Sequence, residues 1–394
     1  MRYRHFPFSH DQYPYFIREG LSVTDVYKTM VRLGILSFRP NVVLNFSESS
    51  GYTDYIRTVS PLVLNEGLKR SVCFTLTRLS HYPNGSYNIS DRVLQECNVT
   101  VVIARDKISD SSFETLKSLK HDWNVRIVVD TDDDLFAIPP THPEYSVYRG
   151  RLERYIKLLE LADVITASTS PVLDGIRKHT ETNAEMTIIP NYIDERIWRL
   201  KQPRPERIGD TIRILYSGTL THTQDLLLLQ EALIDAKNEI KKTLGKELEL
   251  VVFGGSPVPI EGMHVVEVPD HCKSYPAFAR WIQEMHGDDG FQLAVAPLDT
   301  KNPLNFAKSN LKYLEYSAMG IPAIYSDMLP YRDAVLKKIT GLLVENSTTN
   351  WRDAIIWMAS HPEEAFNMGV AAFEDVRNNH LLQRNFDAWA NILE

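Results

Sequence analysis

Residues 305–327 read NFAKSNLKYLEYSAMGIPAIYSD, and this stretch indicates the class of structure. We expect a helix from Lys308, because apolar side chains then recur every three or four residues and would face a core. Gly320 stands where a helix ends in a left-handed residue, and Pro322 starts the exit into the apolar run AIYS. A helix that turns directly into a buried strand is typical of an α/β sheet.

Short apolar runs rich in β-branched residues alternate with helical stretches along the chain. Many are apolar throughout, such as VTVVIA and LVVF, as expected when helices cover both faces of a parallel sheet. The alternation predicts two doubly wound, Rossmann-like α/β units. The strands expected in the first unit are Asn41–Phe46, Ser71–Leu76, Thr100–Ala104, Val125–Val129, Val164–Ala167 and Met186–Ile189. Those expected in the second are Ile212–Tyr216, Leu248–Phe253, His264–Val268, Gln292–Ala296, Ala323–Tyr325 and Leu342–Val344.

The segment KQPRPERIGD, residues 201–210, is rich in proline and charge and separates the two sets of strands. We place the domain boundary there. The chain then divides into an extension (1–39), a first domain (40–200), a second domain (201–377) and a C-terminal helix (378–394) expected to pack back on the first domain. Ligands of open α/β sheets bind at the carboxyl ends of the strands, so two such domains are expected to face each other across a ligand-binding cleft.

Composition excludes several classes of protein. Hydrophobic residues make up 43% and charged residues 24% of the chain, which is ordinary globular usage. The formal net charge is −8 and no Lys/Arg block exceeds a pair, which argues against a nucleic-acid scaffold with a basic face. This balance still allows a small anionic ligand held by a few local cations.

The cysteines Cys73, Cys97 and Cys272 are few, odd in number and without metal-site spacing, which predicts a reducing compartment. The first residues, MRYRHFPFSHDQYPYFIREG, do not resemble a signal peptide. No apolar run approaches the roughly 20 residues that span a bilayer. We therefore expect a cytoplasmic protein, with a peripheral contact at the inner face of the membrane left open.

Within residues 305–327, Lys308, Lys312 and Glu315 stand at i, i+4 and i+7 and would share one helical stripe. Two cations and a carboxylate at the start of a helix suit a nucleotide diphosphate. Backbone N–H groups and lysines would meet the phosphates, and the carboxylate would accept from ribose hydroxyls. From spacing alone, a solvated helix face with a Lys–Glu pair is the more ordinary interpretation.

The run LEYSAMGIPAIYSD resembles the donor-site signature of retaining glycosyltransferases of the GT-B fold, family 4, whose usual form is E-x7-E followed by A-x-G-x-P-V-I. Glu315 matches the second glutamate, whereas Ala307 stands at the first. The patterns K-S-N-x-K-x-x-E and D-x-D-D-D-L-F are similar to a sub-group concerned with bacterial surface polysaccharides. The resemblance implies a nucleotide-diphosphate-sugar donor, transfer with retention to a hydroxyl of a glycan or lipid-linked glycan, and no required cofactor or metal.

Other segments resemble the same family in order and spacing, namely IIPNYID, ILYSGTLTHTQDL and VVFGG. In the family's phosphate-binding loop the usual arginine and lysine are replaced by Thr219, Thr221, His222 and Asp225. Lys308 and Lys312 would therefore carry more of the diphosphate charge. Lys308 and Glu315 are the donor-side residues expected to act in catalysis. The full set of expected donor contacts is Gly218, Thr219, His222, Gly254, Gly255, Lys308, Ser309, Asn310, Lys312 and Glu315.

The run VRIVVDTDDDLFAIP, residues 125–139, places clustered aspartates after an apolar strand. Such carboxylates repel one another, so stability alone explains them poorly. They could hold a metal, as in the single-domain GT-A transferases, or contact acceptor and sugar in a GT-B cleft, and Asp134 could cap the next turn. We favour the second interpretation, with Asp132 and Asp133 catalytic and with Arg105 and Asp134 on the acceptor side. His142 is a weaker candidate.

The loop after the first expected strand, in NFSESSGYTDYIRTVSPL, resembles the glycine loop that faces the acceptor in the family. Gly51 and Arg57 are the candidates there, although a surface loop with a solvated arginine fits as well. Two other functions stay open for the whole chain. One is a nucleotide-sugar epimerase on the same fold, and the other is a non-catalytic nucleotide- or glycan-binding homologue, which Ala307 favours.

Overall fold

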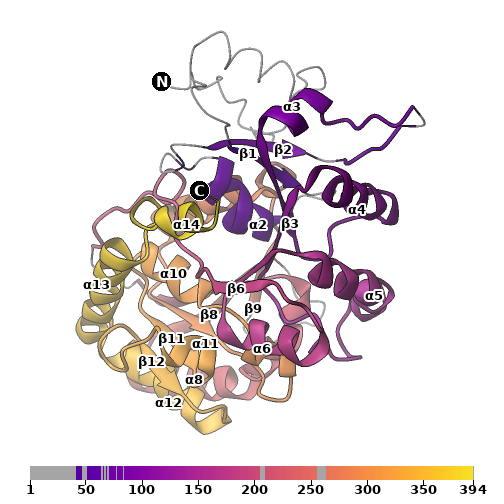
Figure 1. Cartoon of the computed structure of the whole chain (residues 1–394). Helices are drawn as coiled ribbons and strands as arrows, with labels where there is room; N and C mark the ends of the chain where they lie inside the picture. Colours follow the sequence, from indigo (N-terminus) through magenta and orange to yellow (C-terminus); the bar gives the residue numbers. More distant parts are fainter. Residues whose placement is uncertain are drawn as a thin grey trace. The chain divides into compact units, whose positions relative to one another are not determined.

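The structure is a computed structural model that describes residues 41–46, 51–63, 65, 68, 71–76, 78–82, 84–204, 209–254 and 263–393 (Figure 1). The expected extension (1–39) and Gly255 lie outside the described residues. The chain divides into two compact units. The first contains the described residues up to Phe136, residues 146–190 and the described residues from Asn385 onward. The second contains residues 137–145 and 191–384. The chain thus passes from the first set of strands into the second unit at residue 191, which lies before the predicted boundary segment 201–210.

The first unit is a six-stranded parallel sheet in the order β2-β1-β3-β4-β5-β6. Every described pair of neighbouring strands is parallel, and Ala104 at the end of β3 pairs with Asp130 near the end of β4. The strands are β1 Asn41–Phe46, β2 Ser71–Leu76, β3 Asn98–Ala104, β4 Arg126–Thr131, β5 Val164–Ala167 and β6 Glu185–Ile188. The helices are α2 Tyr52–Asp54, the π-helical η1 Tyr55–Val63, α3 Asp91–Glu96, α4 Asp110–Trp123, α5 Tyr145–Leu161 and α6 Ser170–His179.

The second unit repeats this architecture with the strand order β12-β11-β10-β7-β8-β9, again with parallel pairs throughout. Its strands are β7 Thr211–Ser217, β8 Glu247–Phe253, β9 Met263–Val266, β10 Leu293–Ala296, β11 Ala323–Ser326 and β12 Leu342–Val344. Its α-helices are α7 Thr223–Leu227, α8 Gln230–Leu244, α9 Tyr275–Asp289, α10 Leu311–Ala318, α11 Leu329–Arg332, α12 Thr348–Ser360 and α13 Pro362–Asn379. The 3₁₀ turns are η2 Leu220–His222, η3 Asp270–Cys272, η4 Pro303–Phe306 and η5 Leu382–Arg384.

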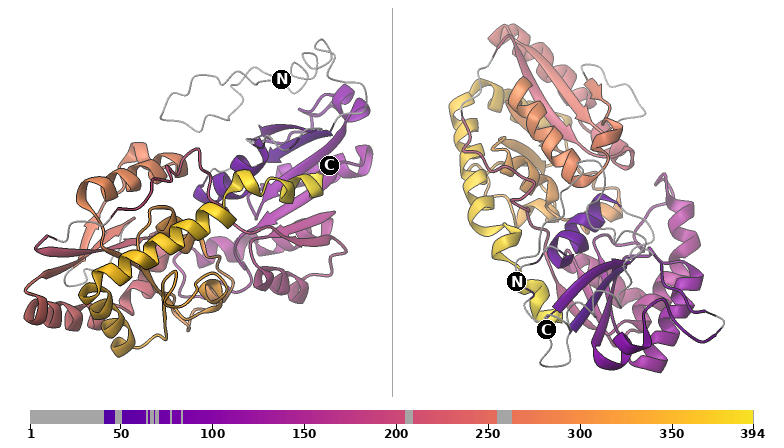
Figure 2. Two further views of the ribbon diagram at one scale, coloured as in Figure 1. Left: turned by 90° about the vertical axis from the view of Figure 1, so that its left-hand side faces the viewer. Right: turned by 90° about the horizontal axis from the view of Figure 1, so that it is seen from above.

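Within each unit helices lie on both faces of the sheet (Figure 2), which explains the continuously apolar strands. All six residues of β3 after Asn98 are buried, as are all four residues of β10. In the second unit β7, β8 and β10 share one core cluster with α8 and α12, in which Trp351 is fully buried. The predicted α/β class and all twelve predicted strands are therefore confirmed, with differences of at most two residues at their ends.

The helix expected from Lys308 begins later, and that prediction was wrong. α10 starts at Leu311 with Asn310 at its N-cap, because a separate 3₁₀ turn, η4, ends just before Lys308. Its other end follows the prediction. Gly320 has φ +72°, and the N–H groups of Gly320 and Ile321 donate to Ser317 and Tyr316.

The stretch 378–394 is not a single helix as expected, since α13 ends at Asn379 and α14 (Asp387–Leu393) follows the turn η5. α14 belongs to the first unit and lies beside α2 in Figure 1. The carbonyl of Ile392 accepts from Arg126 of β4, and the carbonyl of Phe386 accepts from Asn65 at 3.3 Å. Apolar burial of Trp389 adds to these contacts, so this late segment completes the first unit.

Candidate functional site

Each sheet has one point where the connections that follow two neighbouring parallel strands leave in opposite directions, and ligands of open α/β sheets bind at the carboxyl ends there. In the first unit this point lies between β1 and β3, and in the second between β7 and β10. Tyr316 of α10 bridges the second point. Its hydroxyl accepts from the N–H of Ser217 at 3.1 Å and donates to the carbonyl of Val295 at 3.3 Å. α10 is thereby fixed across both strands.

Two glycines meet at the ends of β7 and β8. Gly254 has φ +101°, and a Cβ there would lie 2.1 Å from the carbonyl oxygen of Gly218. The N–H of Gly218 donates to the carbonyl of Phe253 at 3.0 Å. The sequence predicted that glycine 254 lets backbone approach a nucleotide, but the close approach in the structure is to Gly218 itself. Glycine at 254 is therefore explained by the packing of these two strand ends.

Asp225 of α7 joins three segments at this edge. Its carboxylate accepts from the N–H of Asp299 at 2.6 Å, from the side chain of Asn305 at 2.7 Å, and from Nδ1 of His222 at 2.8 Å. Although burial opposes its charge, these bonds lower the pKa of Asp225. Asp225 thus orients the imidazole of His222, whose other ring nitrogen, Nε2, points away from Asp225.

The imidazole of His222 is only 17% exposed. Burial and the positive charges of Lys312 and Lys308 lower its pKa to about 4, against the opposing effect of Asp225. His222 is therefore neutral at neutral pH. An arriving anion would compensate the nearby positive charges and favour protonation of the ring.

Lys312 lies over the ring of Tyr216, with Nζ 5.5 Å from the ring centroid. Burial lowers the pKa of Lys312, and Lys308 acts in the same direction, whereas the carboxylates of Asp225 and Glu315 raise it. Lys308 is half-buried in the loop before α10 and does not share a helical stripe with Lys312. The two lysines nevertheless interact electrostatically, so the structure brings them to one place.

The remaining expected donor residues surround this cluster. The hydroxyl of Ser309 accepts from the side chain of Asn191 at 2.8 Å, and Asn310 is the N-cap of α10. Thr219 and Thr221 share a hydrogen bond of 2.7 Å. Ser309 and Asn310 follow Lys308 directly, and the carbonyl of Thr219 accepts from the N–H of His222 at 3.0 Å. Hydroxyl and backbone groups therefore lie on the same loops as Lys308 and His222, as an anion site needs.

Glu315 is 8% exposed and has two aromatic residues behind it. Its Oε1 accepts from the hydroxyl of Tyr275 at 2.9 Å, and this hydroxyl accepts from Nε1 of Trp198 at 3.3 Å. Burial raises the pKa of Glu315 to about 7, while Tyr275 and Lys312 act against that rise. A buried carboxylate with a raised pKa beside a lysine is typical of a functional site.

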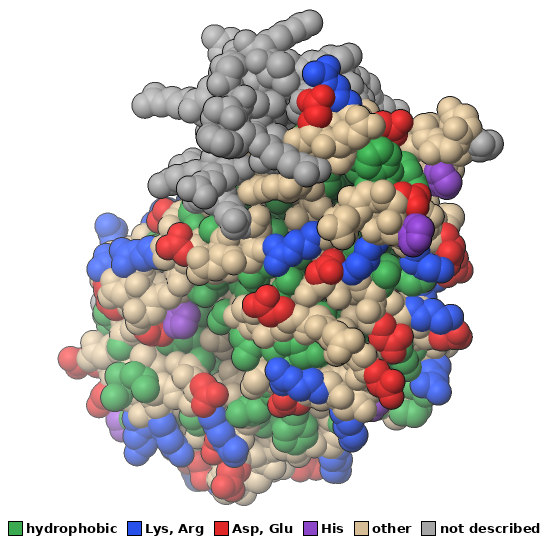
Figure 3. Space-filling view, viewed as in Figure 1, with side chains coloured by type: hydrophobic (Ala, Val, Ile, Leu, Met, Phe, Trp, Pro, Cys, Tyr) green, Lys and Arg blue, Asp and Glu red, His purple; other side chains and the backbone are tan. Residues whose placement is uncertain are grey.

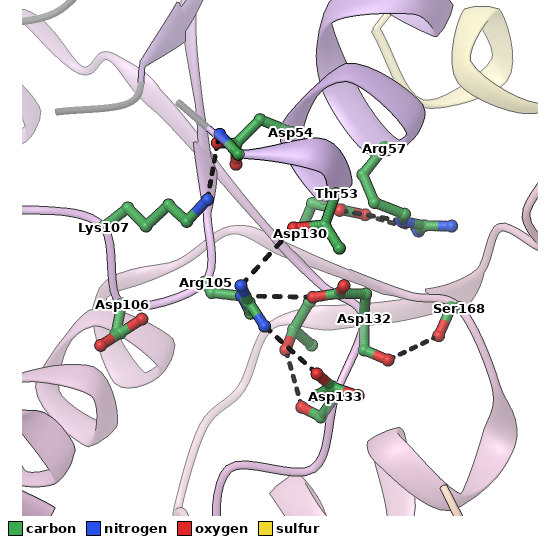
Figure 4. Close-up of polar contacts among 12 residues, drawn as sticks. Thr53, Asp54, Arg57, Arg105, Asp106, Lys107, Asp130, Asp132, Asp133 and Ser168 are labelled. Carbon is green, nitrogen blue, oxygen red and sulfur yellow. Dashed lines mark hydrogen bonds and ion pairs between the residues drawn. The ribbon is translucent and has the colours of Figure 1, made fainter. Parts of the chain in front are cut away.

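In the first unit, Arg105 lies between the two aspartates that follow β4 (Figure 4). Its Nε is 3.3 Å from Asp132 and its Nη1 is 3.2 Å from Asp133. Burial raises the pKa of Asp132, and Arg105 opposes that rise. Arg105 has φ 51°, an unusual left-handed conformation for an arginine, and its N–H donates to the carbonyl of Asp130 at 2.7 Å. Residues that follow neighbouring parallel strands thus meet at one edge.

A second ion pair lies beside the first (Figure 4). Lys107 contacts the buried carboxylate of Asp54 at 2.6 Å, and the N–H of Gly51 donates to the same oxygen at 2.7 Å. Thr53 links the two pairs, because its hydroxyl accepts from Arg105 at 3.5 Å. Gly51 and Arg105 are therefore brought into one neighbourhood with Asp132 and Asp133.

Arg57 does not occupy the acceptor side, and neither the expected acceptor contact nor the solvated alternative holds. It is 3% exposed, forms two bonds with Asp130 at 3.1 and 2.7 Å, and donates to the carbonyl of Ile189 at 2.5 Å. Asp130 also accepts from Thr166 at 2.6 Å. Arg57 is a structural residue that neutralises a buried carboxylate inside the unit.

Asp134 takes the capping role that the sequence left open. Its carboxylate accepts from the N–H of Phe136 at 3.0 Å and packs against Gly175 of α6. Its assignment to the acceptor side stays a prediction. His142 lies in the second unit, where Nδ1 accepts from the N–H of Glu144 at 3.1 Å.

The described residues show neither a metal-binding cluster nor a membrane-spanning helix. They contain no group of three or more His, Cys, Asp or Glu side chains arranged to hold a metal ion. They also include no helix long and apolar enough to cross a membrane. On the face in Figure 3, acidic and basic side chains are interspersed and form no large patch of one sign.

No protein-family model matches this sequence, and no curated protein matches it either. Solved structures do. Sucrose-phosphate synthase from Thermosynechococcus elongatus is similar with a TM-score of 0.60 and 15% identity, over 90% of this chain and 98% of that one. HepE from Anabaena, solved with UDP-glucose, has a TM-score of 0.59 and 9% identity, over 90% and 100%. The glycosyltransferase WaaG has a TM-score of 0.54 and 12% identity, over 89% and 99%.

The chain has the GT-B fold. The predicted fold is thereby confirmed. The assignment to a family-4 sub-group stays a prediction, because identities this low show the fold alone.

Sequence reasoning missed the residues that hold the candidate groups in place. Tyr316 and Tyr275 form their hydrogen bonds with residues far away in the sequence, and no local sequence pattern predicts such contacts. The Lys107–Asp54 pair was missed for the same reason. One indication of Tyr316 was present in the sequence, because this residue follows Glu315 directly in the segment that resembles the family's donor site.

Proposed function

We propose that this protein transfers a sugar from a nucleotide-diphosphate-sugar to a hydroxyl of a glycan or related acceptor, with retention, in glycan biosynthesis. The observation that carries the proposal is the cluster at the β7–β10 switch point. There Lys308, Lys312 and His222 surround an edge whose carboxylate Asp225 is already occupied by hydrogen bonds. Such an edge favours an anionic ligand.

In this proposal the diphosphate lies against Lys308, Lys312 and the N–H groups around Gly218, Thr219 and Ser309. Glu315 accepts from the ribose, since its carboxylate is buried, oriented and next to Lys312. HepE was solved with UDP and with UDP-glucose, which makes UDP the first nucleotide to test here.

The bond that breaks joins the sugar's anomeric carbon to the diphosphate oxygen, and the bond that forms joins that carbon to the acceptor oxygen. The departing diphosphate takes the acceptor proton on the same face, so configuration is retained. Lysines placed where negative charge develops stabilise the leaving group, which is the main contribution that we assign to the protein. No metal or covalent protein intermediate enters this scheme.

We assign the acceptor to the first unit. Asp132 and Asp133 are half-buried carboxylates held by Arg105, and carboxylates of this kind accept hydrogen bonds from sugar hydroxyls. Asp133 is the residue that we place nearest the transferred sugar. We also place the reaction in the cytoplasm, which the small number of cysteines in the sequence, three, favours.

The test has two steps. Calorimetry with UDP, GDP and dTDP first identifies a nucleotide that binds, and the matching sugar nucleotides are then incubated with and without glycan acceptors. Longer glycans that require acceptor support the proposal. A sugar nucleotide altered without acceptor would instead identify an epimerase, and binding without turnover would identify a non-catalytic homologue. Absence of all nucleotide binding would overturn the donor site.

A further inference from the structure

We propose that Tyr275, supported by Trp198, is the positioning residue of Glu315 and makes the site selective for a ribose over a deoxyribose. This inference rests on the proposed donor site. It adds two residues from segments that no motif in the sequence singled out. Tyr275 begins α9, and Trp198 lies in the segment before β7.

The chemistry of the three groups fixes the direction of the hydrogen bonds. Indole Nε1 of Trp198 can only donate, so the hydroxyl of Tyr275, 3.3 Å away, is its acceptor. That hydroxyl then directs its own hydrogen to Oε1 of Glu315 at 2.9 Å. Glu315 is thereby held in the form that accepts hydrogen bonds. Among the described residues no hydrogen bond reaches its other oxygen, Oε2, which stays available to a ligand.

The supporting segment is itself anchored to α9. Gln283 of α9 accepts from the N–H of Arg199 at 2.7 Å and donates to the carbonyl of Ile197 at 3.1 Å. These bonds flank Trp198, which is 1% exposed, while Tyr275 is 4% exposed. The pair is therefore fixed on both sides, and the direction of the Glu315 carboxylate is set before a ligand arrives.

A carboxylate oxygen held in a fixed direction distinguishes a ligand that has a hydroxyl at that position from one that lacks it. A ribose hydroxyl donates to Oε2, whereas a deoxyribose leaves this buried oxygen without a partner. Sites built to bond a hydroxyl reject analogues that lack it much more strongly than apolar sites reject a missing methylene. If Tyr275 did not hold the carboxylate, Glu315 could turn toward Lys312, and much of this discrimination would be lost.

The test measures the dissociation constants of the full chain for UDP, 2′-deoxy-UDP and 3′-deoxy-UDP, with GDP and its deoxy forms in parallel. We expect wild type to prefer the ribonucleotide to one deoxy form by about tenfold or more. Tyr275→Phe keeps the ring and removes the hydroxyl, so the preference should fall to about twofold while affinity for the deoxy form changes little. Trp198→Phe should give an intermediate ratio.

Tyr313→Phe is the matched control. It removes another buried tyrosine hydroxyl from α10, one that donates to Asp375 at 2.6 Å and has no bond to Glu315. Its ribose preference should equal that of wild type. Thermal unfolding of each variant checks folding, and Trp198→Phe, which leaves the Tyr275–Glu315 bond intact, carries the test if Tyr275→Phe does not fold.

Measuring the ribose preference over a range of pH distinguishes loss of Glu315 positioning from a general disturbance of the site. The Tyr275 bond lowers the pKa of Glu315, so its removal should move the acid limb of the ribose preference to higher pH. A folded Tyr275→Phe with the wild-type ratio and pH limb would overturn the inference and leave the proposed function standing. So would a wild type that binds both sugars equally. A wild type that binds no nucleotide would instead overturn the proposed function.

Discussion

The two sheets are both parallel and each has a switch point at its carboxyl edge, but the two edges have opposite electrostatics. In the first unit Arg105 faces two carboxylates, Asp132 and Asp133, so negative charge is in excess. In the second unit Lys308 and Lys312 lie near one carboxylate that is occupied by hydrogen bonds. The other carboxylate there is that of Glu315, whose pKa burial raises to about 7.

This difference shows how one architecture can be specialised twice. The sheet supplies an edge where loops from neighbouring strands meet, and the few residues after each strand decide which ligand the edge attracts. A carboxylate-rich edge suits neutral hydroxyl groups, while a lysine-rich edge suits a diphosphate. Five measurements would test this contrast.

Arg57→Met should lower the free energy of unfolding by about 3–5 kcal/mol, because it leaves Asp130 charged and buried without its partner. Urea unfolding measures the loss. Arg92→Met is the control, since it removes an exposed pair with Glu96 and should cost at most about 1 kcal/mol. A similar loss of unfolding free energy in both variants would mean that the Arg57–Asp130 pair does not stabilise the first unit.

Lys312→Met should weaken UDP binding about 10- to 100-fold, since it removes a buried charge at the proposed phosphate site and keeps the length of the side chain. Calorimetry measures the change. Lys301→Met, at an exposed lysine of a neighbouring loop, should bind as wild type does. The contrast between the edges also requires that Asp133→Asn leave UDP affinity unchanged. An equal loss from Asp133→Asn would break the contrast.

Below pH 6.5, the binding of UDP should be accompanied by the uptake of a proton at His222. In the free protein the pKa of His222 is about 4, chiefly through burial, and a bound diphosphate would raise it. Calorimetry at pH 5.5 in buffers of different ionisation enthalpy counts the protons. His222→Asn should reduce the count and so separates the histidine from the phosphate itself. An unchanged count would remove His222 from the site.

The same shift has a consequence for stability. The folded-state pKa of His222 lies below the unfolded value of 6.5, so the unfolded chain binds more protons between pH 6.5 and pH 4. Stability from this group is therefore complete above pH 6.5 and is lost as the pH falls through that window. Thermal unfolding of His222→Asn should show a weaker dependence on pH there than wild type.

EDTA should leave the transfer rate unchanged. Arg105 lies between Asp132 and Asp133, where a bridging cation would otherwise be needed to balance them. Initial rates with and without chelator test this expectation. Activity that EDTA abolishes and Mn²⁺ restores would contradict the metal-free interpretation of Asp132 and Asp133.

The sequence predicted the strands well because each is a continuous apolar run that only a sheet covered on both faces explains. The left-handed end of α10 was equally readable, since Gly320 is followed by Pro322. The start of the same helix was not. Ser309 and Asn310 favour a cap over a helix interior, and the resulting break separates Lys308 from the helical stripe.

The candidate site was predicted unevenly for a physical reason. Residues that follow strand ends, such as Arg105 and Asp132, could be placed because parallel strands end at one edge. Partners that come from distant segments could not. Arg57 reaches Asp130 and Tyr275 reaches Glu315 across 73 and 40 residues, and no local periodicity carries such pairings.

Helix α14 belongs to the first unit although it follows the second unit in the chain. A ribosome adds about 5–20 residues per second, so α14 emerges roughly 10–40 seconds after β6. Through that interval the nascent first unit lacks the cover that Trp389 and Leu393 later provide. Its surface beside β4 is then open to chaperones, and the unit can be completed only after the second has been synthesised.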